Sequence, residues 1–383
     1  DPDRSMTNWP VTESSTPYYG GSFLFFKYLS DRLGPDFLRE IILRPENGLD
    51  GVDAALRQFA SNNEGLTADT LYLEWITANL LAAIGQPDGK YRYQDYSLPE
   101  DGEHLLIQSL PCEDGSVNAE TMQYGVDYYR LDCPDGQYEI RLTGEPFVPV
   151  IGRDAIAGNY SWWTNAVTNS ETSLVRAFDL SEIKDGPITL SYEIAYEIEP
   201  GFDFLYLSWS TDDGRHWQNL RTGNGTDQNE SGFNLGWGYT GSSNGILHET
   251  VDLSAFAGEQ LMLRFDYLTD QALVQDGALI DNIQIDAIGF RDDAETDDAG
   301  WEASGFVRLY NSVPQNFALT RVRSDGTASE IVFASWERGD GAVFLCDFDD
   351  GTEIVRECLW GISAINRYSR ESGSYAIEVL RIQ

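Results

Sequence analysis

Beyond Gly85 the apolar residues of the chain fall in short alternating runs that are separated by turn sequences. The clearest run, Phe202 to Ser210, leads into Asp212-Asp-Gly214, and Trp217 follows shortly after. Alternation with a period of two is typical of β-strands, and glycine readily adopts the positive φ that a tight turn needs. We therefore predict a β-hairpin here, with Trp217 re-entering the core, and strands through most of the remaining chain.

A second hairpin is predicted around the turn Pro134-Asp-Gly136, which lies between the strand-like runs Tyr124–Cys133 and Tyr138–Leu142.

The first 85 residues show a helical spacing instead. Apolar residues between Gly20 and Gly34 recur at the separations that place them on one helix face, and Gly34 is a typical residue at a helix C-terminus. Pro35 suits a first helical position, and Thr67 suits an N-cap. Four helices are predicted, at residues 20–34, 35–43, 50–60 and 67–84. Their short links favour a small bundle.

Acidic residues greatly outnumber basic ones: 63 Asp and Glu stand against 25 Lys and Arg, for a formal net charge of −38. Such a chain repels nucleic acid and anionic membranes, so neither is an expected partner. A solvated acidic surface accounts for most of the carboxylates, and a few are candidates for binding Ca²⁺. No apolar run reaches the roughly 18 residues of a transmembrane helix. The chain opens at Asp1 in a polar stretch without a Met, and we expect a processed or truncated piece.

The four cysteines form two locally spaced pairs, and each pair brackets turn-rich strand segments. Neither pair has the Cys or His spacing of a zinc site. Three connectivities are open from the sequence, with buried free thiols as the alternative. We favour the local pairing of Cys112 with Cys133 and of Cys346 with Cys358. Disulfides would indicate an oxidising, extracellular compartment.

A chain of 383 residues is long enough for two to four domains. We expect a multidomain, mainly β fold, with a small N-terminal helical bundle followed by β-sandwich or jelly-roll domains. The expected boundaries are 1–86 for the helices, 87–154 for a first β segment, 155–290 for a two-sheet jelly roll and 291–383 for a C-terminal β domain. Strands of 87–154 could pair with the C-terminal strands in one sandwich, with the jelly roll inserted between its halves.

Six motifs of the central block occur in an order that resembles a known family. They are Trp162-Trp-Thr-Asn165, Phe178-Asp-Leu180, the run Phe202–Gly214, Thr240-Gly-Ser-Ser-Asn-Gly245, Val251-Asp-Leu-Ser-Ala-Phe-Ala-Gly258 and Leu279-Ile-Asp-Asn-Ile283. This order resembles the accessory β-sandwich of immune inhibitor A-like secreted metallopeptidases. The helical segment, with Pro17-Tyr-Tyr-Gly20, Leu33-Gly-Pro35 and Trp75-Ile-Thr-Ala-Asn79, resembles the region after the zinc site of gluzincin-type metallopeptidases.

The resemblance implies a secreted zinc endopeptidase whose His-Glu-x-x-His helix supplies two zinc ligands and the general base. This chain has only His104, His216 and His248, isolated from one another, and no such motif. We therefore expect Zn²⁺ only in a full-length parent and predict that this chain alone is inactive. In relatives with this Pro-Tyr segment, a Tyr hydroxyl stabilises the oxyanion of the tetrahedral intermediate, which implies that role for Tyr18, with Tyr19 as the alternative.

The resemblance to jelly rolls also implies a Ca²⁺ site where the opening loop meets the last strand. Asp281, Asp203 and Glu171 are the candidate ligands, because Ca²⁺ takes six to eight oxygens from sequence-distant segments. The alternative is that these are ordinary strand-end and solvated acids.

Two aromatic residues of the Gly-rich loop 232–245, Trp237 and Tyr239, are weaker candidates for stacking on sugar rings. They would serve a different function: a non-catalytic extracellular jelly-roll module that binds carbohydrate or protein. The expected partner is thus a protein substrate or an extracellular polymer. The helical segment 1–85 favours the peptidase interpretation, since a binding module has no need of it.

Overall fold

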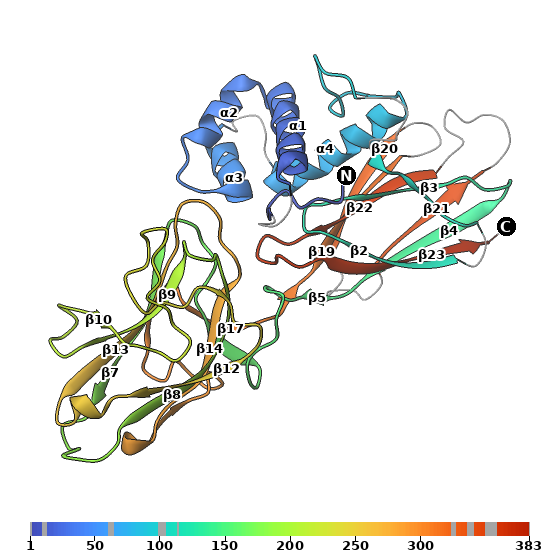
Figure 1. Cartoon of the computed structure of the whole chain (residues 1–383). Coiled ribbons are helices and arrows are strands. Elements are labelled where there is room, and N and C mark those ends of the chain that lie inside the picture. Colours follow the sequence, from blue (N-terminus) through green and yellow to red (C-terminus); the bar gives the residue numbers. More distant parts are fainter. Residues whose placement is uncertain are drawn as a thin grey trace. The chain divides into compact units, whose positions relative to one another are not determined.

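The computed structural model describes residues 2–9, 14–59, 65–98, 105–112, 115–322, 327–334, 341–348 and 358–382, which form two compact units (Figure 1). The flanking unit comprises residues 1–150 and 312–383, and the inserted unit comprises residues 151–311. The mainly β fold with a small N-terminal helical region is confirmed. The inserted unit extends beyond the expected limits 155–290, because strands that follow residue 300 complete its sheets.

Four helices open the flanking unit: α1 (Thr16–Leu33), α2 (Pro35–Ile42), α3 (Gly48–Phe59) and α4 (Ala68–Ala83). They lie where the sequence predicts helices, although α1 begins four residues early, with Pro17 in its first turn. Gly34 has φ 94° and its N–H donates to the Ser30 carbonyl, which ends α1. The Thr67 side chain accepts from the Thr70 N–H and caps α4.

The flanking unit also contains a sandwich of two sheets. The first has the order β1 (Gln108–Ser109), β3 (Asp127–Leu131), β22 (Cys358–Ile365), β19 (Asn316–Val322) and β20 (Ala328–Ala334). The second has the order β2 (Gly115–Thr121), β23 (Gly373–Arg381), β4 (Gln137–Gly144) and β21 (Ala342–Asp347). Strands that precede the inserted unit therefore pair with strands that follow it.

Helix α4 packs against β19, β20 and β22, on the side of the first sheet where Figure 1 shows the helices. The second sheet covers the opposite face. Consequently every residue of β22 is buried, which explains why its sequence is almost continuously apolar instead of alternating. A hydrogen bond of 2.7 Å joins the hydroxyls of Thr77 in α4 and Thr320 in β19, so these two buried polar groups satisfy each other.

A turn at Pro134-Asp-Gly136 lies between β3 and β4, where the sequence predicts a second hairpin. That prediction is wrong, because β3 and β4 belong to different sheets. The turn carries the chain from one sheet to the other. Two strand-like runs around a turn indicate a reversal of the chain, but they do not show whether the strands pair with each other.

A short pair of strands frames the inserted unit within the flanking unit. The strand β5 (Phe147–Val148) lies just before the insertion, and β18 (Val313–Pro314) lies just after it. They pair antiparallel, with Val148 opposite Val313. The chain thus leaves the flanking unit and returns to it at one place.

The inserted unit is a two-sheet antiparallel sandwich around an aromatic-rich core. One sheet has the order β10 (Gln218–Asn219), β9 (Phe204–Ser210), β13 (Gln260–Leu268), β7 (Glu171–Asp179) and β16 (Glu302–Ser304). The other contains β11 (Gly241–Ser242), β8 (Thr189–Ile198), β14 (Gly277–Ile285), β6 (Tyr160–Trp163) and β17 (Val307–Tyr310), with β12 (Leu247–Asp252) on β8 and β15 (Phe290–Asp292) on β14.

The predicted hairpin is present as β9 and β10, which pair antiparallel with Trp209 opposite Gln218. Gly214 has φ 75°, as the turn requires. The loop is longer than a tight turn, since pairing resumes only at Gln218. Trp217 is half-buried, with the Arg264 guanidinium 4.5 Å from its ring centre, so it lies beside the core and not within it.

Both predicted disulfides are confirmed, Cys112–Cys133 and Cys346–Cys358, and both lie in the flanking unit. The sequence of the inserted unit holds no cysteine. Among the described residues, none of the helices combines the length and the apolar character needed to cross a membrane.

Candidate functional site

Three carboxylates of the inserted unit meet at one end of its sandwich. Glu199 and Asp203 flank the turn between β8 and β9, and Asp270 follows β13. Strands β9 and β13 pair antiparallel with Phe204 opposite Leu268, which brings the turn beside the segment that contains Asp270. One oxygen from each carboxylate lies within 4.8 Å of the others. We call these three residues the acid cluster.

Asp203 is the most enclosed member, with 0% of its surface exposed. Its Oδ1 accepts a hydrogen bond of 2.8 Å from the Asp270 N–H. Its Oδ2 and the Oε2 of Glu199 are buried, and neither accepts a hydrogen bond that meets normal geometry within the described part of the chain. The backbone of Glu199 is well held, because its carbonyl accepts from the Thr240 hydroxyl at 3.0 Å.

Burial raises the pKa of Asp203 to about 7. The neighbouring charges of Glu199 and Asp270 raise this pKa further, while the Asp270 N–H and the Tyr267 hydroxyl lower it. Burial, followed by the charge of Asp270, also raises the pKa of Glu199. The cluster therefore concentrates negative charge where water stabilises it poorly, so bound protons or a cation would relieve it.

The other two predicted Ca²⁺ ligands lie outside the acid cluster. Asp281 is buried in β14, where its carboxylate accepts from the Ser161 hydroxyl at 3.0 Å and the Ala157 N–H at 3.3 Å. Burial raises its pKa to about 6. Glu171 begins β7 and interacts with Asp266. Within the described residues, no group of three metal-ligating side chains contains Asp281 or Glu171.

Sequence reasoning thus found one member of the acid cluster and missed two. Glu199 and Asp203 are four residues apart around the tight segment Glu199-Pro-Gly-Phe-Asp203, a spacing that could have signalled a shared turn. Asp270 carries no local signal. Its place depends on the register of β9 against β13, which the sequence does not show.

The two candidate tyrosines differ in their surroundings. Tyr18, in the first turn of α1, is 7% exposed, and its hydroxyl accepts from Arg4 Nη1 at 3.3 Å. It lines a cavity of about 370 Å³ together with Leu24 and Trp75. Tyr19 is 63% exposed. Trp9 packs against both rings, at centroid distances of 5.7 Å and 4.8 Å.

The two candidate sugar-stacking residues do not present free ring faces together. Tyr239 is fully buried in the core of the inserted unit, where its hydroxyl lies 2.5 Å from that of Tyr192. Trp237 is half-buried, and the Arg221 guanidinium lies 4.2 Å from its ring centre. The backbone of Tyr239 pairs with that of Leu205 in β9, so this part of the loop lies against the sheet, which loop composition alone does not reveal.

The two described histidines are exposed and paired with carboxylates. His216 Nδ1 lies 2.6 Å from Asp212 Oδ2, and His248 Nδ1 lies 2.9 Å from Glu193 Oε1. Neither belongs to a metal-ligating group of three within the described ranges. His104 lies outside the described residues. These residues do not fit a zinc site.

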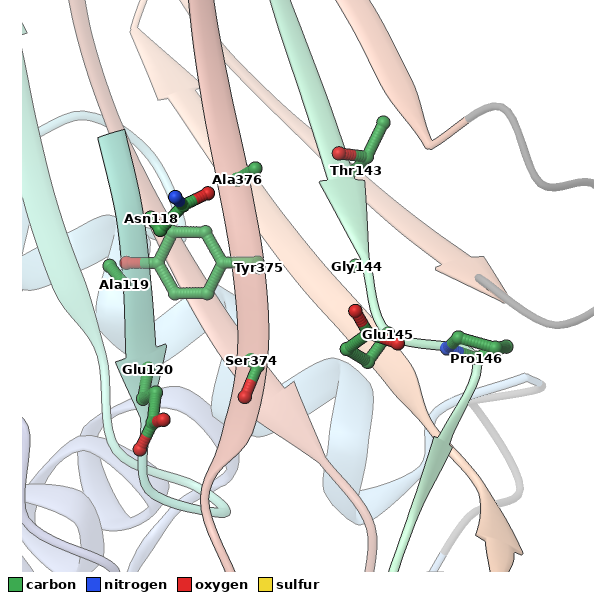
Figure 2. Close-up of a pocket in the computed structure, with 10 residues that line it drawn as sticks. All are labelled: Asn118, Ala119, Glu120, Thr143, Gly144, Glu145, Pro146, Ser374, Tyr375 and Ala376. Atoms are coloured by element: carbon green, nitrogen blue, oxygen red, sulfur yellow. The ribbon is translucent and has the colours of Figure 1, made fainter. Parts of the chain in front are cut away.

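A shallow groove of about 580 Å³ crosses the outer face of the second sheet of the flanking unit (Figure 2). Figure 2 shows Asn118, Glu120, Thr143 and Glu145 around it. Tyr375 is largely buried and its hydroxyl donates to Asp127 at 2.6 Å, so the groove offers little aromatic surface to a ligand. Nothing in its lining forms a catalytic arrangement.

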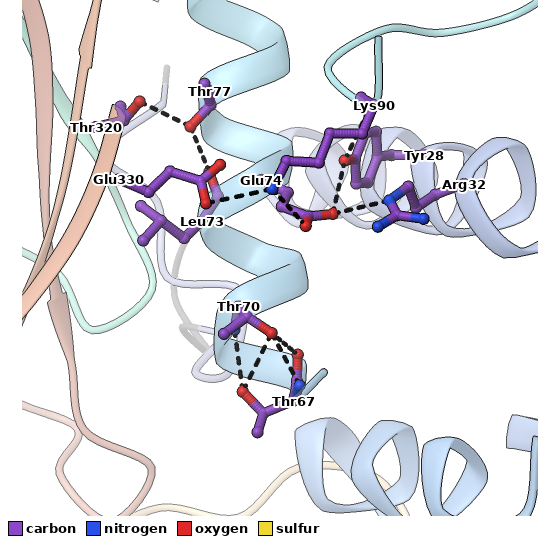
Figure 3. Close-up of polar contacts among 10 residues, drawn as sticks. All are labelled: Tyr28, Arg32, Thr67, Thr70, Leu73, Glu74, Thr77, Lys90, Thr320 and Glu330. Carbon is purple, nitrogen blue, oxygen red and sulfur yellow. Dashed lines mark hydrogen bonds and ion pairs between the residues drawn. The ribbon is translucent and has the colours of Figure 1, made fainter. Parts of the chain in front are cut away.

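A buried carboxylate of the flanking unit has a different environment from the acid cluster (Figure 3). Glu74 of α4 is 3% exposed. It accepts from Arg32 Nε at 3.0 Å, Lys90 Nζ at 2.8 Å and the Tyr28 hydroxyl at 3.3 Å. Two cations and a hydroxyl thus surround one anion, which links α1 and the segment after α4 to the buried helix.

Comparison with known proteins finds similarity over the inserted unit. Residues 145–310 match the family model of the immune inhibitor A-like MAM domain. A stretch of 150 residues, 37% of the chain, is 32% identical to immune inhibitor A of Bacillus thuringiensis subsp. alesti. This match spans 20% of the length of that relative. The resemblance predicted from the ordered motifs is confirmed for this part of the chain.

Proposed function

We propose that this chain is the C-terminal, accessory portion of a secreted zinc-dependent endopeptidase that resembles immune inhibitor A. The match of residues 145–310 to a domain of that family carries the proposal. Two disulfides support an extracellular location, since such bonds persist in oxidising compartments. The β-domains would stabilise the enzyme or engage a protein substrate.

The helices α1–α4 would form the end of the catalytic domain in this proposal. Helix α4 shares a hydrophobic core with β19 and β22, so this packing would join the catalytic domain to the sandwich. Arg367, between β22 and β23, adds ion pairs of 2.7 Å and 2.6 Å to Asp50 and Asp53 of α3 and of 2.8 Å to Asp69 of α4. A catalytic domain that ends in these helices would be held firmly on the sandwich.

The Tyr18 hydroxyl is the better candidate for stabilising an oxyanion in the parent enzyme. It lines a cavity, and because it accepts from Arg4 its own proton stays available for donation. Tyr19 remains the alternative, since its exposed side chain could reach a substrate outside that cavity. The described residues do not fit a zinc ion, so the role proposed for this chain is confined to the tyrosine hydroxyl.

The alternative role, a sugar-binding or protein-binding module without catalysis, has less support. Tyr239 is buried, and Arg221 lies over Trp237. Neither aromatic residue therefore forms the open platform that stacking on a sugar ring requires.

Zinc content and proteolysis test the proposal. The longest reading frame that contains this sequence should bind one zinc per chain and hydrolyse casein in a reaction that 1,10-phenanthroline stops. The present chain should do neither. Zinc-dependent proteolysis by the present chain would contradict its inactivity, and a full reading frame without zinc or proteolysis would contradict the peptidase parent.

Matched tyrosine variants of the full-length protein test the oxyanion role. Tyr18→Phe should lower kcat by about 100-fold or more with little change in KM, as expected for loss of a donor used in the transition state. Tyr19→Phe and the exposed control Tyr368→Phe should leave kcat nearly unchanged. A loss confined to Tyr19→Phe would transfer the role to Tyr19, and unchanged kcat in both would remove it.

A further inference from the structure

We propose that Glu199, Asp203 and Asp270 form a Ca²⁺-binding site at the turn between β8 and β9 of the inserted unit. The proposal concerns a site in the sandwich itself and does not depend on whether the parent protein is a peptidase.

The carboxylate oxygens are placed as cation ligands require. Three of them, one from each residue, converge within 4.8 Å of one another. Carboxylates repel one another at this separation unless something positive lies between them. No Lys or Arg forms an ion pair with any of the three among the described residues.

Two buried oxygens that accept no hydrogen bond of normal geometry point more specifically to a ligand. Asp203 has no exposed surface, yet its Oδ2 accepts no hydrogen bond of normal geometry in the described structure. The buried Oε2 of Glu199 is in the same situation. Buried polar atoms nearly always have a hydrogen-bond partner, and leaving one without a partner is destabilising, more so when the atom is charged. A cation would satisfy both oxygens at once.

The donor set favours Ca²⁺ over other metals. All three ligands are carboxylates, and the group contains no His or Cys, which zinc prefers. Two ligands lie in a turn and one in a following loop, so the site can adjust to the large and variable coordination shell of Ca²⁺. Water and backbone oxygens would complete that shell, as they commonly do.

Binding would hold together two segments that lie just beyond the ends of paired strands. The turn Glu199–Asp203 would be tied to Asp270 across the β9–β13 pair. The exposed rings of Phe202 and Phe233, 5.9 Å apart, lie beside this turn. A bound Ca²⁺ would therefore also order Phe202, the exposed aromatic residue of this turn.

Terbium luminescence on the full chain tests the site directly, with Tb³⁺ as the probe and Ca²⁺ as the competitor. The Tyr267 hydroxyl interacts with the Asp203 carboxyl, so excitation of tyrosine should sensitise Tb³⁺ bound here. Wild-type protein should show saturable emission that Ca²⁺ displaces. Asp203→Asn and Glu199→Gln should each weaken Ca²⁺ binding by at least about tenfold, since affinity follows the number of charged ligands.

Two controls keep the test decisive. Asp281→Asn removes another buried carboxyl of the inserted unit, in β14, and should leave Ca²⁺ affinity unchanged. In EGTA, Asp203→Asn should raise the Tm, because it removes unbalanced charge, and it should abolish the Tm increase that Ca²⁺ gives the wild type. If Asp203→Asn fails to fold, the same Tm measurements in EGTA and in Ca²⁺ can be made on Glu199→Gln and Asp270→Asn.

Several results would overturn the proposal. Absence of saturable Tb³⁺ or Ca²⁺ binding would show that protons, and not a metal, relieve the cluster. Binding that survives in Asp203→Asn and Glu199→Gln but is lost in Asp281→Asn would move the site to β14. Tighter binding of Mg²⁺ than of Ca²⁺ would contradict the choice of ion.

Discussion

Glu74 of the flanking unit and Asp203 of the inserted unit are both buried carboxylates, but only Glu74 has counter-charges beside it. Glu74 lies between Arg32 and Lys90, whereas Asp203 lies between two further acids. In a chain with 25 basic and 63 acidic residues, cations are scarce, and Glu74 receives two of them. A buried anion left without one is therefore the more informative feature. The first arrangement holds helices in place, and the second has the properties of a binding site.

The largest expected difference in stability between the two units comes from the disulfides, which lie only in the flanking unit. Cys112–Cys133 and Cys346–Cys358 close separations of 21 and 12 residues, and loops of this size give about 3 kcal/mol each. Reduction should destabilise the flanking unit by about 6 kcal/mol and leave the inserted unit unchanged, as followed by hydrogen exchange of peptides from each unit. Equal loss of protection in both units would mean that they unfold together.

The next effect concerns the paired carboxylate. Glu74→Gln should destabilise the flanking unit by about 3 kcal/mol in urea unfolding, because Arg32 and Lys90 lose their shared partner next to a buried helix. The control Glu40→Gln removes the ion pair of Glu40 with Arg44 near the surface and should cost less than about 1 kcal/mol. Similar losses in the two variants would show that burial of Glu74 adds nothing to its ion pairs.

The free energy of unfolding of the flanking unit should depend on pH through Asp127. This buried carboxyl has no cation partner among the described residues. Burial raises its pKa to about 6, the Tyr375 hydroxyl lowers it, and the charge of Asp3 raises it. The folded state thus holds a proton that the unfolded state releases at lower pH. Stability should therefore be lost as the pH rises from about 4 to about 6 and stay lost above, by up to about 3 kcal/mol.

Asp127→Asn should flatten this dependence in unfolding experiments from about pH 4 to about pH 8. Tyr375 and Tyr129, which share a hydrogen bond next to Asp127, titrate far above this range and should not contribute. A pH profile that is identical in the variant would assign the effect to other groups.

The smallest expected effect on stability comes from replacing a turn glycine or a helical glycine by alanine, and the two replacements should act in opposite directions. Gly214 has φ 75° and its added Cβ would lie 3.3 Å from the Trp217 ring, so Gly214→Ala should destabilise the inserted unit by about 1 kcal/mol. Gly20 lies in α1 with open space around it, and Gly20→Ala should stabilise the flanking unit by up to about 1 kcal/mol. Thermal unfolding should show Tm shifts of opposite sign. A lower Tm in both variants would contradict the conformational argument.

Features that depend on neighbouring residues could be predicted from the sequence. The ends of the helices at Gly34 and Thr67, the turn at Gly214 and the local disulfides follow from backbone preferences and short loops. The separation of β3 and β4 into different sheets does not, because it depends on which distant strand each one meets.

The candidate site shows the same limit. Asp203 could be named as a candidate cation ligand because of the resemblance to jelly rolls that bind Ca²⁺. Glu199 and Asp270 become its neighbours only through the turn and the register of β9 on β13. Burial of Tyr239 likewise depends on the sheet that covers it. Distances between residues far apart in sequence depend on how the strands pack and pair. The spacing of apolar residues along the sequence does not predict them.

The pairing of β5 with β18 makes the inserted unit interchangeable in principle. Because departure and return points are adjacent strands, the flanking fold constrains only the spacing of two chain ends and not the size or contents of what they enclose. An inserted unit of this kind could be exchanged, enlarged or deleted during evolution without changes to the fold of the flanking unit. A gene in which residues 151–311 are replaced by a short flexible linker should therefore still encode a folded flanking unit.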